Sequence, residues 1–523
     1  MAVPSVTTPR RNVSMARLFL LAPLLLVIAC ASGDPPVPQA DASFCRNIHR
    51  DSTVHLAEQL RPFDTLMARR TGVFVLEEGD AALITRAWLS EYAERTIDVQ
   101  YFIFSADNVG LIAVDYLLRA ADRGVFVRVL VDDLLVEADA DALIALDSHP
   151  NVAVRIYNPG VNVGKTLPGK LVKFARDFRG ANQRMHNKTF TVDGRIVITG
   201  GRNIADEYFD YDHAYNFRDR DVLLLGGVAA TVQRSFDEYW ADALSRPVSA
   251  LVAAADHVVP DSEFIQRVHG YACDPRNYWP QVRARVEAIP AAFDRIRASG
   301  GLAWVDSVRF VYDAPGKNDG HDGLGGGGIT LDTLVQLVRE ARTSIDIQSP
   351  YLITTELGRS LLRDAVARGV RVRILTNSLA STDNLEAFSG YARDRDVLLA
   401  TGAHIFEVRP DASARRTIMT GSLQGTLARI PIFGLHAKSM VIDGHITVVG
   451  TFNMDPRSAN LNTECLTIIY SDQIAMGVGA RMTEEFGPEN AWETTRDANP
   501  DGHASSAKRL KAWYRRAIPK AVL

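Results

Sequence analysis

The chain has 523 residues, a formal net charge of −4 at pH 7 and 47% hydrophobic residues. This length exceeds one typical domain core, so we expect two domains or two fused halves of an ordinary globular protein. The nearly balanced charge provides no overall attraction for a polyanion, so no nucleic acid partner is expected. Contact with an anionic lipid surface must then be local, and the oligomeric state stays open.

Residues 1–30 have the layout of a secretory signal peptide, because three arginines precede an apolar run over residues 18–28. The run is too short for a comfortable membrane span. It ends in Val27-Ile28-Ala29-Cys30, which resembles the lipobox of bacterial lipoproteins, where the cysteine is lipidated. A simple signal peptide cleaved near Ala31, or an uncleaved anchor, is the alternative.

A lipidated Cys30 places the protein in the cell envelope of a bacterium, lipid-anchored on the periplasmic side. Ala31 follows the cysteine where an aspartate would favour the inner membrane, so by resemblance to Gram-negative sorting rules the outer membrane is favoured over the inner. Residues 31–71 are expected to form a tether and an N-terminal segment, since three prolines at positions 35, 36 and 38 prevent a regular element there.

From Gly72 the chain alternates strand and helix patterns. Strands are predicted at 73–76, 96–103 and 125–131, with helices at 80–95 and 108–123 between them. The same order returns later, where Ser344-Ile345-Asp346-Ile347-Gln348 matches Thr96-Ile97-Asp98-Val99-Gln100. A repeat of whole halves predicts an α/β protein of two homologous halves, each a mixed, largely parallel β-sheet flanked by helices.

The expected segments follow from this repeat and from the weaker periodicity between its copies. They are a first half at 72–246, a connector with helices at 247–302, a second half at 303–490 and a basic C-terminal tail at 491–523.

A short pattern of chemically reactive residues occurs once in each half. Lysine follows histidine by two positions in His186-Asn187-Lys188 and in His436-Ala437-Lys438. Asn203 and Asn453 each follow their histidine by seventeen positions. Because alternate strand residues face the same side, each histidine and its lysine project together. The identical spacing indicates duplication of one folding unit, with one active site at the pseudo-twofold interface.

Two facing histidines can divide the work on a phosphodiester. A neutral one attacks phosphorus and a protonated one gives its proton to the leaving alkoxide, and an unperturbed pKa of about 6.5 makes both states accessible at neutral pH. Lys188 and Lys438 provide positive charge for the phosphate oxygens, and Asn203 and Asn453 add neutral donors. The expected chemistry therefore needs no metal and no cofactor.

Carboxylates are expected to orient each imidazole through its other nitrogen. Glu464 in the second half and Asp219 or Asp221 in the first half are the candidates. Asp193 and Asp443, seven positions after the histidines, are also counted as catalytic candidates. Each lies in an Asp-Gly pair, where aspartate serves a turn as readily as a reaction.

These residues resemble the phospholipase D superfamily, whose signature His-x-Lys-x-x-x-x-Asp occurs twice here. From about Gly72 to about Phe486, further segments resemble the C-type bacterial cardiolipin synthases; they are 184–188, 200–209, 376–380, 453–458 and 461–464. The resemblance implies that His186 is the nucleophile of a phosphohistidine intermediate and His436 the general acid. Ser458, within the fourth segment, is counted as a supporting residue.

The reaction implied by this resemblance is phosphatidyl transfer, forming cardiolipin from phosphatidylglycerol and a second phospholipid, with phospholipids and a membrane surface as partners. The first alternative is a phospholipase D that hydrolyses phospholipids to phosphatidic acid with the same residues. A secreted nuclease is less consistent with the mildly acidic charge and the lipid anchor. A non-catalytic lipid-binding lipoprotein would be expected to have lost a histidine or lysine.

Two stretches combine basic and apolar or aromatic residues, namely 164–184 and 508–523. Each could lie on an anionic bilayer, or could be a solvated basic segment.

Three cysteines remain besides Cys30, and an oxidising compartment permits one disulfide. Because Cys465 lies in an apolar strand pattern, Cys45 with Cys273 is the favoured pair, and free thiols are the alternative.

Overall fold

The computed structural model describes residues 41–48, 55–136, 140–160, 180, 182–251, 261–319, 324–418 and 431–520. Cys30, the predicted signal peptide and most of the basic stretch 164–184 lie outside the described residues. The chain divides into residues 1–37 and a unit from Pro38 to Leu523, and everything below concerns the second unit. Within its described ranges, no helix has the length and apolar character needed to cross a membrane.

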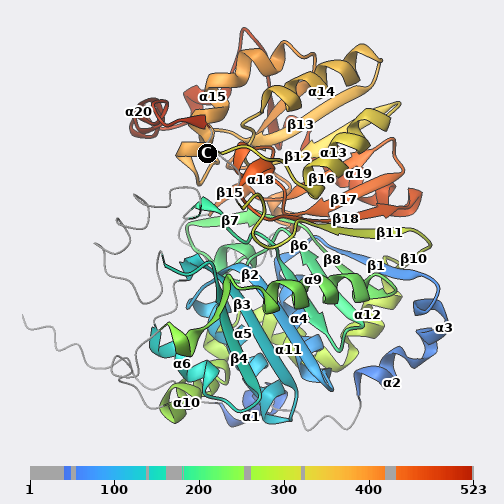
Figure 1. The fold of residues 1–523 in the computed structure, drawn as a ribbon, viewed down its shortest axis with the longest axis vertical. Helices are drawn as coiled ribbons and strands as arrows, with labels where there is room; N and C mark the ends of the chain where they lie inside the picture. Colours follow the sequence, from blue (N-terminus) through green and yellow to red (C-terminus); the bar gives the residue numbers. More distant parts are fainter. Residues whose placement is uncertain are drawn as a thin grey trace, which may run out of the picture. The chain divides into compact units, whose positions relative to one another are not determined.

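Two large mixed β-sheets form the framework of the molecule (Figure 1). In spatial order, the first sheet consists of β10 (Ala303–Val305), β1 (Thr71–Leu76), β8 (Asp221–Gly226), β6 (Ile196–Gly200), β5 (Thr189–Val192), β2 (Thr96–Phe104), β3 (Phe126–Val136), β4 (Val152–Tyr157) and β9 (Ser245–Pro247). The second sheet consists of β11 (Val308–Tyr312), β18 (Cys465–Tyr470), β17 (Ile446–Gly450), β16 (Lys438–Ile442), β12 (Ser344–Gln348), β13 (Arg371–Asn377), β14 (His404–Val408) and β19 (Ala491–Thr494).

The strand order confirms the predicted duplication. From β1 to β9 the first sheet repeats, strand for strand, the order from β11 to β19 of the second. Within the described strands of these two sheets, only β2, β3 and β4, and likewise β12, β13 and β14, pair in parallel. The expectation of largely parallel sheets was wrong, because the histidine motifs lie on tight hairpins, β5–β6 and β16–β17, and hairpin strands run antiparallel.

Helices flank both sheets and begin and end at residues suited to those positions. The first half has α4 (Gly79–Tyr92), α5 (Asn108–Asp122), α6 (Ala140–Asp147) and α9 (Ala229–Ala241), and the second has α13 (Ile329–Glu340), α14 (Glu356–Ala367), α15 (Leu385–Leu399), α16 (Arg415–Ile418), α18 (Pro456–Asn460) and α19 (Asp472–Glu485). The equivalent helices α5 and α14 start at N-caps, where Asp107 accepts from Gly110 N and Thr355 from Gly358 N.

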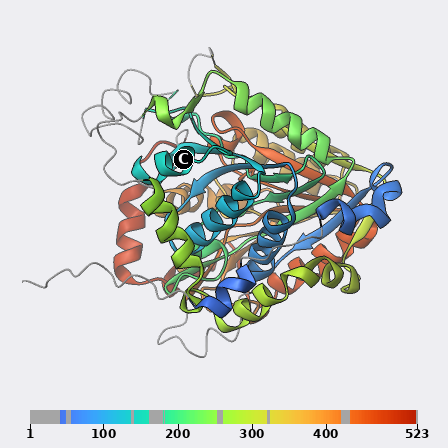
Figure 2. The same ribbon diagram turned by 90° about the horizontal axis from the view of Figure 1, so that it is seen from below.

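Short helices complete the first half on its outer side. Near the N-terminus these are α1 (Ala42–Ile48), α2 (Leu56–Leu60) and α3 (Asp64–Met67), and in the connector α10 (Asp261–Ala272), α11 (Pro280–Glu287) and α12 (Ala292–Ala298). A disulfide joins Cys45 to Cys273, which confirms the favoured pairing. Cys465 is a free, buried thiol. Figure 2 shows the yellow-green connector helices beside the blue and teal helices of the first half.

The two halves share one apolar core in addition to their own. This shared cluster combines Val197 and Leu224 of the first sheet with Val441 and Ile469 of the second. A two-stranded parallel sheet also joins the halves, between β7 (Tyr215–Arg218) and β15 (Ile432–Leu435). Groups on opposite halves are therefore held in fixed relation by buried apolar surface and by backbone hydrogen bonds.

Residues 491–515, which the sequence presents as part of a basic tail, join the second half. They contribute β19 to its sheet and α20 (Ser506–Arg515), which packs against α15. Ile518, shortly after α20, lines the cavity of the site described next.

Candidate active site

The two motif histidines lie at the start of equivalent hairpins, and each is held by the opposite half. The His186 backbone N–H donates to the carbonyl of Thr463 at 3.0 Å, and the His436 N–H donates to the carbonyl of Arg218 at 2.8 Å. His186 precedes β5 and His436 precedes β16, so the pseudo-twofold relation of the sheets brings both side chains to one place.

The carboxylates that orient the imidazoles also come from the opposite half. His186 Nδ1 lies 2.8 Å from Glu464 Oε2, and His436 Nδ1 lies 2.6 Å from Asp219 Oδ2. The two carboxylates occupy equivalent positions, just before β18 and at the start of the turn into β8. Neither imidazole is therefore correctly positioned by its own half alone.

Of the two aspartates considered for the first half, Asp221 does not reach an imidazole. Its Oδ2 accepts from Arg86 at 2.8 Å and lies 3.6 Å from Arg202 Nη1, so it neutralises buried arginines. Asp219 can take its place beside His436 because Gly201 has no side chain. A Cβ at Gly201 would lie 2.0 Å from Asp219 Oδ1.

The hydrogen bonds fix the tautomer of both histidines. Burial raises the pKa of the Glu464 carboxyl, but its contacts with His186 and Thr451 outweigh this and leave the pKa lowered. The pKa of Asp219 is likewise lowered, since the pairing with His436 outweighs burial. Ionised carboxylates only accept hydrogen bonds, so each Nδ1 donates and each Nε2 carries the lone pair of the neutral imidazole.

Both imidazoles are neutral in the empty site. Burial lowers the pKa of His186 to about 4, and the neighbouring Lys188 adds to this effect against the attraction of Glu464. Burial and Lys438 lower the pKa of His436 to about 3. The expectation that both charge states coexist at neutral pH was wrong for the empty site, because it took no account of burial next to two ammonium groups.

The lysines lie behind the histidines and anchor them. Lys188 Nζ donates to the His186 carbonyl at 2.7 Å, and Lys438 Nζ donates to the His436 carbonyl at 2.6 Å. Lys438 Nζ also lies 3.0 Å from His436 Nε2. Burial lowers the pKa of Lys188 to about 7, with a further contribution from Lys438, and burial lowers that of Lys438 to about 8.

A cavity of about 590 Å³ opens between the halves and is lined by both histidines and both motif asparagines. Asn203 Oδ1 accepts from Ile103 N–H at 3.1 Å, and Asn453 N–H donates to Ser458 Oγ at 3.1 Å. Ser458 therefore supports Asn453 and does not contact an imidazole. Among the described residues, no group of three or more acidic, histidine or cysteine side chains is arranged to hold a metal ion.

The two motif aspartates lie at the opposite end of their strands from the histidines. Asp193 Oδ1 accepts from the backbone of Arg95 and Thr96, and Asp443 carboxylate oxygens accept from the backbone N–H groups of 342–344. Both residues have positive φ, 52° and 54°, in the hairpin turns. Seven residues at about 3.3 Å each separate them from the imidazoles. Their contacts correct the expectation of direct chemistry, since both carboxylates fix a turn.

Aromatic rings hold the imidazoles from the sides, a feature that the motifs do not reveal. Phe102 lies edge-on to His186 with ring centroids 5.1 Å apart, and Tyr208 lies edge-on to His436 at 5.0 Å. Phe217 contacts His436 at 4.8 Å. The rings restrict imidazole rotation and exclude water from one side of the site.

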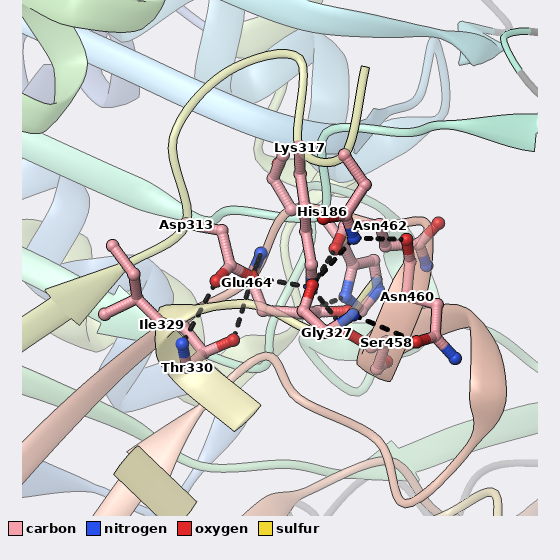
Figure 3. Close-up of polar contacts among 12 residues, drawn as sticks. His186, Asp313, Lys317, Gly327, Ile329, Thr330, Ser458, Asn460, Asn462 and Glu464 are labelled. Atoms are coloured by element: carbon pink, nitrogen blue, oxygen red, sulfur yellow. Dashed lines mark hydrogen bonds and ion pairs between the residues drawn. The ribbon is translucent and has the colours of Figure 1, made fainter. Parts of the chain in front are cut away.

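A buried lysine and aspartate outside the motifs fix the position of Glu464 (Figure 3). Asp313 Oδ2 accepts from the Glu464 backbone N–H at 3.2 Å and from Lys317 Nζ at 2.8 Å. Lys317 Nζ also donates to the carbonyls of Ser458 and Asn462, at 2.8 and 3.0 Å. Sequence reasoning missed this network because Asp313 and Lys317 lie in an irregular loop whose partners are more than a hundred residues away.

Comparison with known proteins identifies the family. Residues 90–240 and 334–486, one segment in each half, match the family described as "Cardiolipin synthase, PLD-like domain". The protein belongs to this cardiolipin synthase family of phospholipase D-like enzymes. Cardiolipin synthase C of Escherichia coli (strain K12) is 34% identical over 451 residues, covering 84% of this chain and 90% of that protein.

More distant relatives agree with the assignment to this family. Cardiolipin synthase 1 of Bacillus anthracis is 25% identical over 487 residues, which cover 90% of this chain and 75% of that protein. Among solved structures, phosphatidylserine synthase of Haemophilus influenzae superposes with a TM-score of 0.57 at 14% identity, covering 88% of this chain and 99% of that one. This last likeness shows the shared fold with two halves.

The carboxylates in the hairpin turns and those beside the histidines should affect different properties, the former stability and the latter turnover. Asp443→Ala should lower the free energy of unfolding by about 1–3 kcal/mol, because the partly exposed backbone N–H groups of 342–344 lose their shared, charged acceptor. The folded fraction should keep its kcat. Asp219→Asn should reduce kcat by about 10²- to 10⁴-fold, because the amide has no negative charge to stabilise a protonated His436 and its NH2 group can favour the wrong tautomer. Thermal unfolding and turnover of phospholipid measure the two effects. A kcat loss in Asp443→Ala matching that in Asp219→Asn would contradict the structural role.

The lowered pKa of His436 predicts proton uptake on binding of a phosphodiester anion. His436 is neutral at pH 6, and a nearby negative charge favours its protonated form. Calorimetry in buffers of different ionisation enthalpy, with glycerophosphoglycerol as a probe of constant charge, should show uptake approaching one proton. A His186→Asn background prevents turnover of the probe. Proton uptake should vanish in the double variant His186→Asn/His436→Asn. If the double variant takes up as many protons as the single variant, the proton binds to a group other than His436.

Proposed function

We propose that this protein is a phosphatidyltransferase that forms cardiolipin from phosphatidylglycerol and a second phospholipid through a phosphohistidine. The crossed pairs His186–Glu464 and His436–Asp219, facing one cavity in a chain of the cardiolipin synthase family, carry the proposal. Similarity to a protein named cardiolipin synthase C supports this product.

In the first step, Nε2 of His186 attacks phosphorus and the bond from phosphorus to the leaving alkoxide breaks. His436, protonated when the anionic substrate enters, gives its proton to that alkoxide. The amides of the two asparagines, which line the cavity, stabilise the charge that develops on the non-bridging oxygens, and the positive charges of Lys188 and Lys438 beside the histidines act on it at longer range. The products are a released alcohol and a phosphatidyl group bound to His186.

In the second step, the neutral His436 takes a proton from a hydroxyl of phosphatidylglycerol. The oxygen attacks phosphorus, the bond from His186 Nε2 to phosphorus breaks, and cardiolipin leaves. With water in place of the lipid alcohol, the same steps produce phosphatidic acid. The size of the cavity supports transfer, because about 590 Å³ admits a headgroup alcohol beside the phosphate.

We further propose that the mouth of this cavity faces a membrane surface. In α20, Trp513 and Tyr514 are 60% and 65% exposed, and basic residues surround them. Such a combination suits the headgroup region of an anionic bilayer. Ile518, shortly after α20, lines the cavity, so contact at α20 would bring lipid to the site.

The lipobox-like sequence supports a proposed anchor through a lipidated Cys30, outside the described residues. A single acyl chain binds membranes only marginally, whereas the multiple chains of a bacterial lipoprotein hold a protein stably.

The product assay tests the proposed reaction. Purified protein incubated with vesicles of phosphatidylethanolamine and phosphatidylglycerol should produce cardiolipin, identified by mass spectrometry. His186→Asn should reduce the rate by about 10³-fold or more, because the imidazole that forms the phosphohistidine is removed. His445→Asn, at an exposed histidine outside the cavity, is the matched control and should keep the wild-type rate. Phosphatidic acid without cardiolipin would establish the hydrolase instead.

Membrane fractionation tests the anchor. In cells, wild-type protein should partition with outer membranes and carry label from a metabolically supplied fatty acid, and Cys30→Ala should lose the label. Complete retention of the unlabelled variant on membranes, with no label on wild type, would contradict lipidation at Cys30.

A further inference from the structure

The two halves differ in how their equivalent outer helix pairs are covered. In the first half, 13 of the 14 residues of α4 and 10 of the 15 residues of α5 are buried, because the connector helices pack on this pair. In the second half, only 4 of the 12 residues of α13 and 2 of the 12 residues of α14 are buried. Among the residues that the structure describes, the duplicated helix pair therefore keeps an uncovered face in the second half only.

An apolar slot of about 80 Å³ lies beneath this uncovered pair, between α13, α14 and the second sheet. Its walls include Leu334, Val335, Leu361, Met440, Phe452 and Met454. At its rim Leu357 is 42% exposed, and Ile329 nearby at the start of α13 is 57% exposed. The slot is several times larger than the roughly 10–15 Å³ that one water needs, and most of its lining is apolar.

The equivalent position in the first half is closed. There Phe190 takes the place of Met440 and Ile204 that of Met454, and the cavity measures about 20 Å³. The two halves therefore differ here, because the described part of the first half has no slot of this size at the equivalent position. Exposed apolar surface of this type marks sites where another apolar group binds.

The slot shares a wall with the catalytic cavity. Residues 452–455 alternate in direction, so that Asn453 lines the catalytic cavity while Phe452 and Met454 line the slot, and Asp455 lines both. The start of α13 is tied to the same centre, because Thr330 donates from its N–H and its Oγ1 to Asp313, the residue that also holds Glu464 (Figure 3).

We propose that this slot binds an acyl chain of the phospholipid substrate while the phosphate lies between the two histidines. The inference rests on the proposed function. A phospholipid joins a phosphate to hydrocarbon in one molecule, which is the combination that a polar cavity and an adjoining apolar slot accept. Each methylene moved from water into the slot strengthens binding by roughly fourfold.

Filling the slot tests the proposal. Gly358 lines the slot near the start of α14, and a Cβ there would meet only Thr355 Oγ1 at 3.6 Å and Thr354 Cβ at 3.9 Å. Gly358→Leu should therefore fold, with a gain in helix propensity. KM for dioleoyl phosphatidylglycerol in mixed micelles should rise by about tenfold as the contacts of roughly two methylenes are lost. KM for soluble dihexanoyl phosphatidylglycerol, which offers few methylenes, should stay unchanged.

Gly477→Leu is the matched control, because Gly477 lies within α19 and a Cβ there meets nothing within 4 Å. It should leave both KM values at the wild-type level. The proposal that the slot binds an acyl chain would be wrong if Gly358→Leu and wild type had equal KM values for the long-chain lipid. It would also be wrong if Gly358→Leu raised KM by the same factor for both lipids. Inactivity of the wild type with both lipids would overturn the proposed function instead.

Photo-crosslinking tests whether an acyl chain lies in the slot without requiring turnover. It also does not depend on whether Gly358→Leu folds. A phosphatidylglycerol with a diazirine near the end of one acyl chain should label residues of α13 and α14 in full-length His186→Asn protein, as mapped by peptide mass spectrometry. The proposal would be wrong if the label appeared only on other segments. That result is also expected if a second copy of the protein or another part of this chain covers the slot.

Discussion

The active site depends on one structural constraint, namely that each half supplies the carboxylate that orients the histidine of the other half. Each half supplies a histidine, and the opposite half supplies the carboxylate that fixes it, so that Glu464 binds His186 and Asp219 binds His436. An isolated half would keep a buried imidazole without its acceptor. The apolar cluster shared by the two sheets and the β7–β15 pairing are therefore requirements of the chemistry as well as of stability.

Much of this arrangement could be predicted from sequence because it rests on repeats and alternation. The duplication into two halves, the placement of each histidine with its lysine and the role of Glu464 follow from spacing within each half. The position of Asp193 could also have been derived, because a short strand directly before it places its side chain at the far end from His186. The signature spacing alone gave it a catalytic role that the strand geometry does not support.

Other features could not be predicted because they depend on contacts between distant segments. The choice between Asp219 and Asp221 depends on the close approach of Gly201 to the turn before β8. The network of Asp313 and Lys317 forms from an irregular loop that meets residues 458–464 only in the folded chain. The slot beneath α13 and α14 depends on connector helices that cover one half and leave the other open.

Burial of four basic groups also determines when the site can react. Both imidazoles are neutral in the empty cavity, because burial and two adjacent ammonium groups oppose a further positive charge. A general acid is thus absent until an anion enters. A phosphodiester supplies the negative charge that favours a protonated His436, while Glu464 keeps His186 oriented as a neutral nucleophile. The structure therefore favours proton uptake by His436 together with the binding of the substrate.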